Sequence, residues 1–218
     1  MQDTSIDSAT VLSLDYARNV LILGSQEPDR FVTTKFGTIV MSVFDDHEES
    51  DNEIGEFEYS LVDVTSGFGQ APLRDIFDAS DFSLSDVFDV LYARDGEELS
   101  APVEELLLEL TRTSYLENPN ILYIDHLELF EEYRGKGFGL RALDGILRAE
   151  SVSFGLAVLK AYPLQYDEEL LKECPKEFRR DTRKLMKHYE RLGFRAIPRT
   201  PYMLLPHATL WSGEGLYN

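Results

Sequence analysis

The sequence has few of the features that mark secreted or membrane proteins. Cys174 is the single cysteine among 218 residues, so no internal disulfide can form, which fits a reducing compartment. No run of about eighteen apolar residues is present, and residues 1–10 lack the basic and apolar zones of a signal peptide. We therefore expect a cytoplasmic protein that neither crosses nor binds a membrane.

Positive charge is also scarce. The chain has 21 Lys and Arg against 40 Asp and Glu, a formal net charge of −19. A surface of this sign repels nucleic-acid phosphates and attracts cationic partners, although acidic residues also serve solubility. We expect no nucleic-acid partner, and a small cationic amine is a candidate substrate.

Metal-binding and nucleotide-binding patterns are missing as well. The acidic segment 45–52 lacks the ligand spacing and glycine of a calcium loop, which favours a solvated hairpin loop. The histidines have no ligand spacing, so we expect no metal. Neither the Walker pattern nor the Rossmann glycine pattern occurs.

A hydrophobic content of 43% is typical of a globular protein, and the apolar patterns predict an α/β fold with a mixed sheet. The capping-box spacing of Ser83 and Asp86 predicts a helix start, and Pro102 fits a first helical turn. Asn118-Pro119-Asn120 is expected to close the helix that follows Pro102. A strand, a helix and a strand in succession predict a βαβ crossover between parallel strands. The expected strands span 36–44, 54–64, 121–130, 152–159, 194–197 and 202–205, and the expected helices lie within 72–115 and at 138–149 and 181–192.

A glycine-rich turn separates the strand at 121–130 from the helix that follows. Its backbone can turn tightly, and the first N–H groups of a helix add unpaired donors and a positive dipole end. With two cations beside the glycines, the turn is suited to a pyrophosphate. Its residues are Arg134, Gly135, Lys136, Gly137, Phe138, Gly139 and Leu140.

This turn resembles the Arg/Gln-x-x-Gly-x-Gly/Ala signature of the GNAT N-acetyltransferases, through Arg134, Gly137 and Gly139. Residues 189–194 (YERLGF) resemble the Tyr-x-x-x-Gly-Phe element of that family. The resemblance covers roughly 120–205 and includes the order of the elements. It implies a mostly antiparallel sheet with one splayed parallel strand pair, flanked by helices. The whole chain, 1–218, would then be one domain, with an acetyl-CoA-binding core at 120–205 and a less recognisable part at 1–119.

The resemblance also implies an acyl donor and its contacts. Acetyl-CoA would bind with its pyrophosphate on the glycine-rich turn and its pantetheine arm along Leu127, Glu128 and Leu129. A backbone N–H of that strand would stabilise the oxyanion of the tetrahedral intermediate. The implied activity is direct transfer of an acetyl group to an amine, either a small cationic amine or a protein amine.

Acyl transfer to an amine needs the amine neutral, so a base or a water relay assists. By position in the family, Asp125 is the candidate base, with Tyr123 on the same face of the strand. In a regular strand Glu128 and His126 lie on the opposite face; a bulge would change this, which makes Glu128 the reserve candidate. Tyr189 is the candidate that protonates the leaving thiolate, or else a tyrosine that packs the helix on the sheet.

The chain also departs from the family. Thr182 stands where many members have an Asn that contacts the donor, and Leu185 follows where alanine is common. The polar segment 162–180 is longer than usual and is either a wall of the acceptor site, a lid or an inert insertion. Two alternatives stay open: a non-catalytic CoA-binding sensor or scaffold, and a toxin that acetylates aminoacyl-tRNA, which the negative charge opposes.

Overall fold

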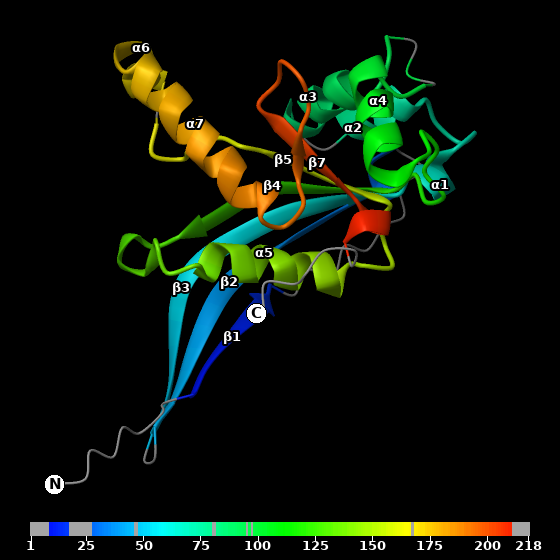
Figure 1. Ribbon diagram of the computed structural model, residues 1–218. Coiled ribbons are helices and arrows are strands. Elements are labelled where there is room, and N and C mark those ends of the chain that lie inside the picture. The colour runs from blue at the N-terminus through cyan, green and yellow to red at the C-terminus, as the bar shows by residue number, and fades with distance from the viewer. Residues whose placement is uncertain are drawn as a thin grey trace, which may run out of the picture.

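The computed structural model describes residues 9–17, 28–45, 48–79, 82–94, 96, 98–166 and 168–210 (Figure 1). It contains a seven-stranded sheet in the order β1-β2-β3-β4-β5-β7-β6. Neighbouring strands are antiparallel except β4 and β5, which are parallel. The predicted α/β class and mixed sheet are therefore confirmed. The strands are β1 (Ala9–Tyr16), β2 (Val32–Asp45), β3 (Glu48–Val62), β4 (Ile121–Leu129), β5 (Leu156–Lys160), β6 (Arg195–Ala196) and β7 (Tyr202–Pro206).

Helices cover both faces of this sheet. Four short helices follow β3, one helix joins β4 to β5, and two helices join β5 to β6. Figure 1 shows α7 extending away from the sheet, with α6 at its far end. The helices are α1 (Val64–Gly67), α2 (Leu73–Asp78), α3 (Phe82–Leu91), α4 (Ala101–Thr111), α5 (Phe138–Ala149), α6 (Glu168–Glu173) and α7 (Pro175–Glu190), with 3-10 turns at Pro28–Phe31, Glu131–Tyr133 and His207–Thr209.

The β4-α5-β5 crossover has the predicted order and the predicted parallel pairing. The helix expected at 138–149 is observed with the same bounds, because its apolar residues recur at helical spacing and a glycine precedes it. Leu140, Leu143, Ile146 and Leu147 are buried against the sheet. The crossover brings the glycine-rich turn to the end of β4.

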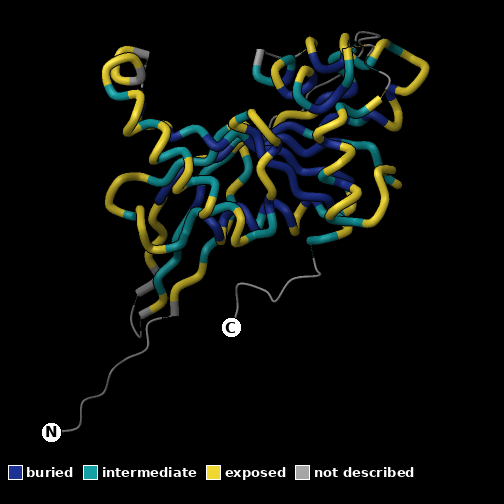
Figure 2. The backbone as a smooth tube through the Cα atoms, turned by 45° about the horizontal axis from the view of Figure 1, so that its top comes forward, coloured by how far each residue is buried: buried dark blue, intermediate teal, exposed yellow. Residues whose placement is uncertain are grey.

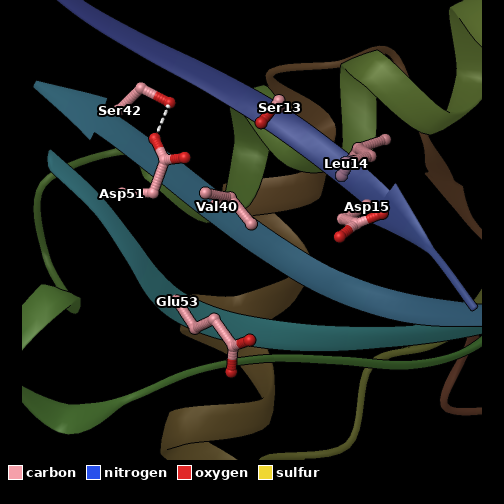
Figure 3. Close-up of a pocket in the computed structure, with 7 residues that line it drawn as sticks. All are labelled: Ser13, Leu14, Asp15, Val40, Ser42, Asp51 and Glu53. Atoms are coloured by element: carbon pink, nitrogen blue, oxygen red, sulfur yellow. Dashed lines mark hydrogen bonds between the residues drawn. The ribbon is translucent and has the colours of Figure 1, made fainter. Parts of the chain in front are cut away.

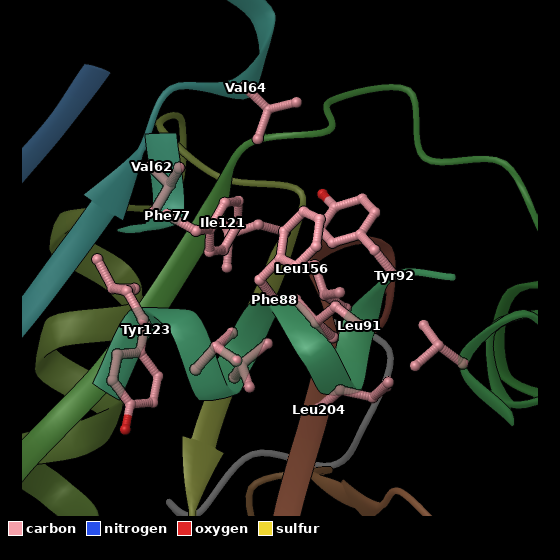
Figure 4. Close-up of a cluster of buried hydrophobic side chains, with 14 of the residues drawn as sticks. Val62, Val64, Phe77, Phe88, Leu91, Tyr92, Ile121, Tyr123, Leu156 and Leu204 are labelled. Atoms are coloured by element: carbon pink, nitrogen blue, oxygen red, sulfur yellow. The ribbon is translucent and has the colours of Figure 1, made fainter. Parts of the chain in front are cut away.

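Residues along β4 and β5 alternate between two hydrophobic cores. The α3-side core contains buried residues of α2, α3 and α4 together with Ile121, Tyr123, Leu156 and Val158 (Figure 4). The α5-side core contains buried residues of α5 together with Leu122, Ile124, Ala157 and Leu159. Both faces of these two strands are covered, so Figure 2 shows the centre of the sheet as its most buried part.

Several predicted boundaries were wrong. The segment 45–52 is mostly strand, because β3 begins at Glu48 and pairs with β2 from there. Ser83 lies inside α3 and does not cap it. The helix that contains Pro102 in its first turn ends at Thr111, well before residues 118–120, and Arg112 follows with a left-handed φ of 65°.

The helix expected at 181–192 begins earlier and includes part of the segment 162–180. Pro175 starts α7, which fits its preference for a first helical turn. Gly193 was expected to cap this helix, but Arg191 is the C-cap, and Gly193 follows two residues later with a φ of 95°. Within the described residues, no helix is long and apolar enough to cross a membrane.

Candidate functional site

The parallel strands β4 and β5 separate after a short stretch of pairing. Residues Ile121–Ile124 pair with Leu156–Leu159, and the pairing ends there. β4 continues to Leu129 paired with β3 alone, whereas the chain after β5 follows β7, with the Ala161 N–H donating to the Pro201 carbonyl at 2.9 Å. From Asp125 to Leu129, one edge of β4 therefore has no partner strand among the described residues.

A β-bulge lies at the point where the two strands separate. His126 pairs with Glu58, and Ile124 pairs with Tyr59, so Asp125 is an extra residue without a partner on β3. A bulge of this kind bends the strand and redirects its side chains. The expectation of a regular strand was therefore wrong.

The bulge reverses which side chains of β4 face each core. Before it, Leu122 and Ile124 belong to the α5-side core; after it, Leu127 and Leu129 pack against the same core. In an unbulged strand, His126 and Glu128 would have taken those positions. They lie instead on the face of Tyr123, so the prediction that they lie on the opposite face is wrong.

A cleft of about 280 Å³ lies where β4 and β5 separate. It is lined on both sides by residues of the two strands, and Tyr189 of α7 also contributes. The sequence had suggested Asp125, Tyr123 and Tyr189, and the structure brings all three to this cleft. Its lining residues are Ser83, Tyr123, Ile124, Asp125, Leu127, Leu159, Lys160, Tyr162, Leu164 and Tyr189.

The ionisable side chains of the cleft differ in exposure. Asp125 is exposed. Tyr123 is buried at the edge of the α3-side core, and its hydroxyl points away from that core (Figure 4). Burial, followed by the negative charge of Asp125, raises the pKa of Tyr123. Burial raises the pKa of Tyr189 to about 12, so its phenol keeps its proton at neutral pH.

The glycine-rich turn has the backbone conformation that its sequence predicts. Gly135 and Gly137 have φ values of 76° and 82°, which L side chains rarely adopt, and an added Cβ at either would meet nothing within 4 Å. Phe138 begins α5, and no side chain caps its N-terminus. The first backbone N–H groups of the helix have no acceptor within the helix. They are available to an anion.

The turn adjoins the unpaired edge of β4. A methyl group added at Gly139 would lie 3.6 Å from Leu129 Cδ1 and 3.7 Å from Leu127 Cδ2, which is ordinary van der Waals contact. The cleft residue Asp125, the unpaired edge of β4 and the turn thus follow one another along the chain, and the turn contacts β4.

The two cations of the turn are placed differently. Arg134 bends back toward β4, where its Nε donates to the Leu129 carbonyl at 2.8 Å and a terminal nitrogen donates to Glu128 Oε1 at 2.7 Å. Lys136 is exposed, and its Nζ lies 5.5 Å from the ring centre of Tyr133. The sequence did not predict the ion pair between Arg134 and Glu128, because the strand's bulge decides where Glu128 points.

Part of the segment 162–180 forms a wall of the cleft. Tyr162 and Leu164 line it, and the ring of Tyr162 lies 5.2 Å from that of Phe178 on α7. Tyr166 Oη donates to Asp181 Oδ2 at 2.8 Å, which fixes this segment against the helix. These contacts place Tyr162 and Leu164 on one side of the cleft.

Thr182 on α7 uses its hydroxyl proton within the helix. Its hydroxyl donates to the Phe178 carbonyl of the previous turn at 2.9 Å. Such a bond within the helix occupies the only donor that the side chain has. The hydroxyl proton of Thr182 is therefore not available to a bound ligand in this conformation.

A second hollow, of about 440 Å³, lies on β1, β2 and β3, away from the cleft (Figure 3). Three carboxylates line it, from Asp15, Asp51 and Glu53, with no basic side chain among the lining residues. Ser42 donates to one of them, Asp51 Oδ1, at 2.6 Å. We assign no site to this open surface.

No protein-family model matches the chain, and no curated protein matches it in sequence. Two solved structures resemble it at low similarity. The crystal structure of a KacTA–DNA complex has a TM-score of 0.40 and 10% identity, covering 82% of this chain and 71% of that one. The crystal structure of a point mutant of KacT has a TM-score of 0.39 and 11% identity, covering 81% and 74%. Scores this low assign neither a family nor a function.

Proposed function

We propose that the protein is an acetyl-CoA-dependent N-acetyltransferase of the GNAT type. The observation that carries this proposal is the unpaired edge of β4, which runs from the cleft at Asp125 to the glycine-rich turn before α5. A strand edge offers amide partners, and a helix N-terminus offers an anion site. A ligand with amides at one end and a pyrophosphate at the other matches both.

Acetyl-CoA has these groups in this order. Its pantetheine amides pair with the backbone of Leu127, Glu128 and Leu129, as an added strand would. Its pyrophosphate accepts hydrogen bonds from the turn at 135–140, with Lys136 close by in the sequence. The guanidinium of Arg134 lies near the same turn and is shared with Glu128.

The acetyl group then lies in the cleft between Asp125 and Tyr189. The neutral amine attacks the thioester carbonyl, a C–N bond forms, and the C–S bond breaks with its electron pair going to sulfur. Asp125 accepts the amine proton directly or through a water molecule, and a backbone N–H of β4 stabilises the oxyanion. Tyr189 donates its phenolic proton to the thiolate and recovers one from solvent.

The acceptor is an amine, either a small cationic amine or an amine of a protein. Asp125 is an exposed carboxylate at the cleft and attracts an ammonium group before the proton is lost. The net charge of −19 also attracts cations to the protein from solution.

Thermal unfolding with and without acetyl-CoA tests donor binding. A ligand at a hundred times its Kd adds about 2.7 kcal/mol to the free energy of unfolding, or roughly 5–10 °C for a domain of this size. We expect this shift in the wild type and none in Gly139→Glu, which adds a negative charge to the first turn of α5, where the pyrophosphate would bind. Gly139→Ala is the matched control, since its methyl group meets only ordinary contacts in the structure.

A shift that is equal in all three proteins would place the donor elsewhere, and no shift in the wild type would contradict the proposal. Release of free CoA thiol in the presence of a panel of amines tests turnover. Tight donor binding without turnover of any amine would favour a CoA-binding sensor in place of the enzyme.

A further inference from the structure

We infer that Glu56, His126 and Glu128 form a binding site for one divalent transition-metal ion of the Zn²⁺ class. The three side chains lie on the sheet face of Tyr123, beyond the bulge, and each offers one ligand atom. These atoms lie within 4.8 Å of one another. The site does not depend on the acetyltransferase proposal.

The spacing of the ligand atoms fits a metal ion. His126 Nε2 lies 3.3 Å from Glu56 Oε1 and 3.7 Å from Glu128 Oε2. Two ligands with bonds of about 2.0–2.1 Å to a tetrahedral ion lie about 3.3 Å apart. The two distances from His126 are close to this value, and all three ligand atoms lie within reach of one ion.

The strand register places two carboxylates against each other. Glu56 on β3 is directly opposite Glu128 on β4. Like charges at directly opposed positions destabilise a sheet unless a cation lies between them. Arg134 neutralises one side of this pair through Glu128 Oε1 at 2.7 Å, which leaves Oε2 directed toward His126.

The imidazole supplies an independent indication of a ligand. His126 Nε2 is screened from solvent, yet it has no hydrogen-bond partner among the described residues. Its distance to Glu56 permits attraction, but the geometry is not that of a hydrogen bond. A buried nitrogen without a partner costs free energy, and coordination to a metal would remove that cost.

The ligand types select the class of ion. Imidazole nitrogen together with carboxylate oxygen suits Zn²⁺ and its first-row neighbours better than Ca²⁺ or Mg²⁺, which prefer oxygen alone. Three protein ligands leave one position of a tetrahedral ion open to water or another ligand. Arg134 holds the second oxygen of Glu128, as outer partners of metal ligands commonly do.

Metal binding can be measured on untagged, metal-stripped protein without acetyl-CoA. Calorimetric titration with Zn²⁺ gives the stoichiometry and Kd, and Co²⁺ reports the ligand geometry through its visible absorption. We expect one ion per chain, bound at least about tenfold more weakly by His126→Gln and by Glu56→Gln. His188→Gln and Glu53→Gln are matched controls that remove a histidine and an acid outside the cluster.

Wild-type binding with unchanged affinity in both controls would support the site. The inference is overturned if no stoichiometric binding occurs, or if His126→Gln and Glu56→Gln bind as the wild type does. Because the titration contains no acetyl-CoA, neither result supports or contradicts the proposed acetyl-CoA site, which the thermal unfolding experiment tests separately.

Discussion

Replacement of Asp125 by asparagine separates catalysis from donor binding. Asp125 is exposed and is the extra residue of the bulge, so its isostere removes a charge without opening a cavity. A surface change of this kind alters the free energy of unfolding by no more than about 0.5 kcal/mol. The backbone edge of β4 stays in place, and acetyl-CoA affinity should therefore be unchanged.

The expected loss is in kcat. A positioned general base contributes about 10²–10⁴ in rate, which corresponds to about 2.7–5.4 kcal/mol in the barrier. The assay is release of CoA thiol at saturating acetyl-CoA over a range of pH, with calorimetry for the donor Kd. Glu53→Gln, an exposed acid elsewhere on the sheet, is the control for net charge. Unchanged kcat in Asp125→Asn would refute the role of this carboxylate as a base. Lost acetyl-CoA affinity would contradict the claim that the donor binds to the backbone edge of β4 without help from the Asp125 side chain.

Three further predictions concern tyrosines. Tyr189→Phe should lower kcat by up to about 10² and leave the donor Kd unchanged, measured in the same assay; a normal rate would leave Tyr189 a packing residue. Tyr59→Phe should lower the free energy of unfolding by about 1.5–3 kcal/mol, because the Tyr59 hydroxyl donates to the buried Glu150 carboxylate at 2.6 Å. Thermal unfolding beside the exposed control Tyr115→Phe checks this, and equal melting temperatures would contradict it. The free energy of unfolding should also fall as pH rises above about 10, because tyrosines ionise there in the unfolded chain but stay protonated where they are buried. Denaturant titrations at several pH values test this. The buried tyrosines with a raised pKa are Tyr59, Tyr92, Tyr123, Tyr189 and Tyr202.

Local patterns accounted for much of the fold around the site. The apolar spacing of 138–149 predicted α5 with its observed bounds, and the order of elements predicted the parallel β4–β5 pair. The glycines at 135 and 137 predicted a tight turn, and both have a positive φ. These features depend on nearby residues, which is why a single sequence contains them.

Features that depend on distant partners were not predictable. The bulge at Asp125 depends on the register between β3 and β4, and the residues of β4 alone do not predict it. The cluster with His126 includes Glu56, which is far away in the sequence, so histidine spacing could not reveal it. Lys160 and Tyr162 enter the cleft only because the chain leaves β5 where β4 continues.

The helix and strand boundaries that were predicted wrongly also depend on residues far away in the sequence. The acidic residues of 45–52 resemble a solvated loop, yet pairing along the β2–β3 hairpin makes most of them strand. Ser83 has the spacing of a capping residue, but α3 begins one residue before it. Propensity is a weak signal when tertiary pairing opposes it.

Hydrogen–deuterium exchange with and without acetyl-CoA shows which backbone amides of the chain the acyl donor protects. We expect slower exchange in two segments, Asp125–Leu129 on the open edge of β4 and the turn at 135–140. Exchange in β1 and β2, which lie away from the cleft, should not change. Protection confined to other parts of the chain, or none under saturating acetyl-CoA, would contradict the assignment of the donor site.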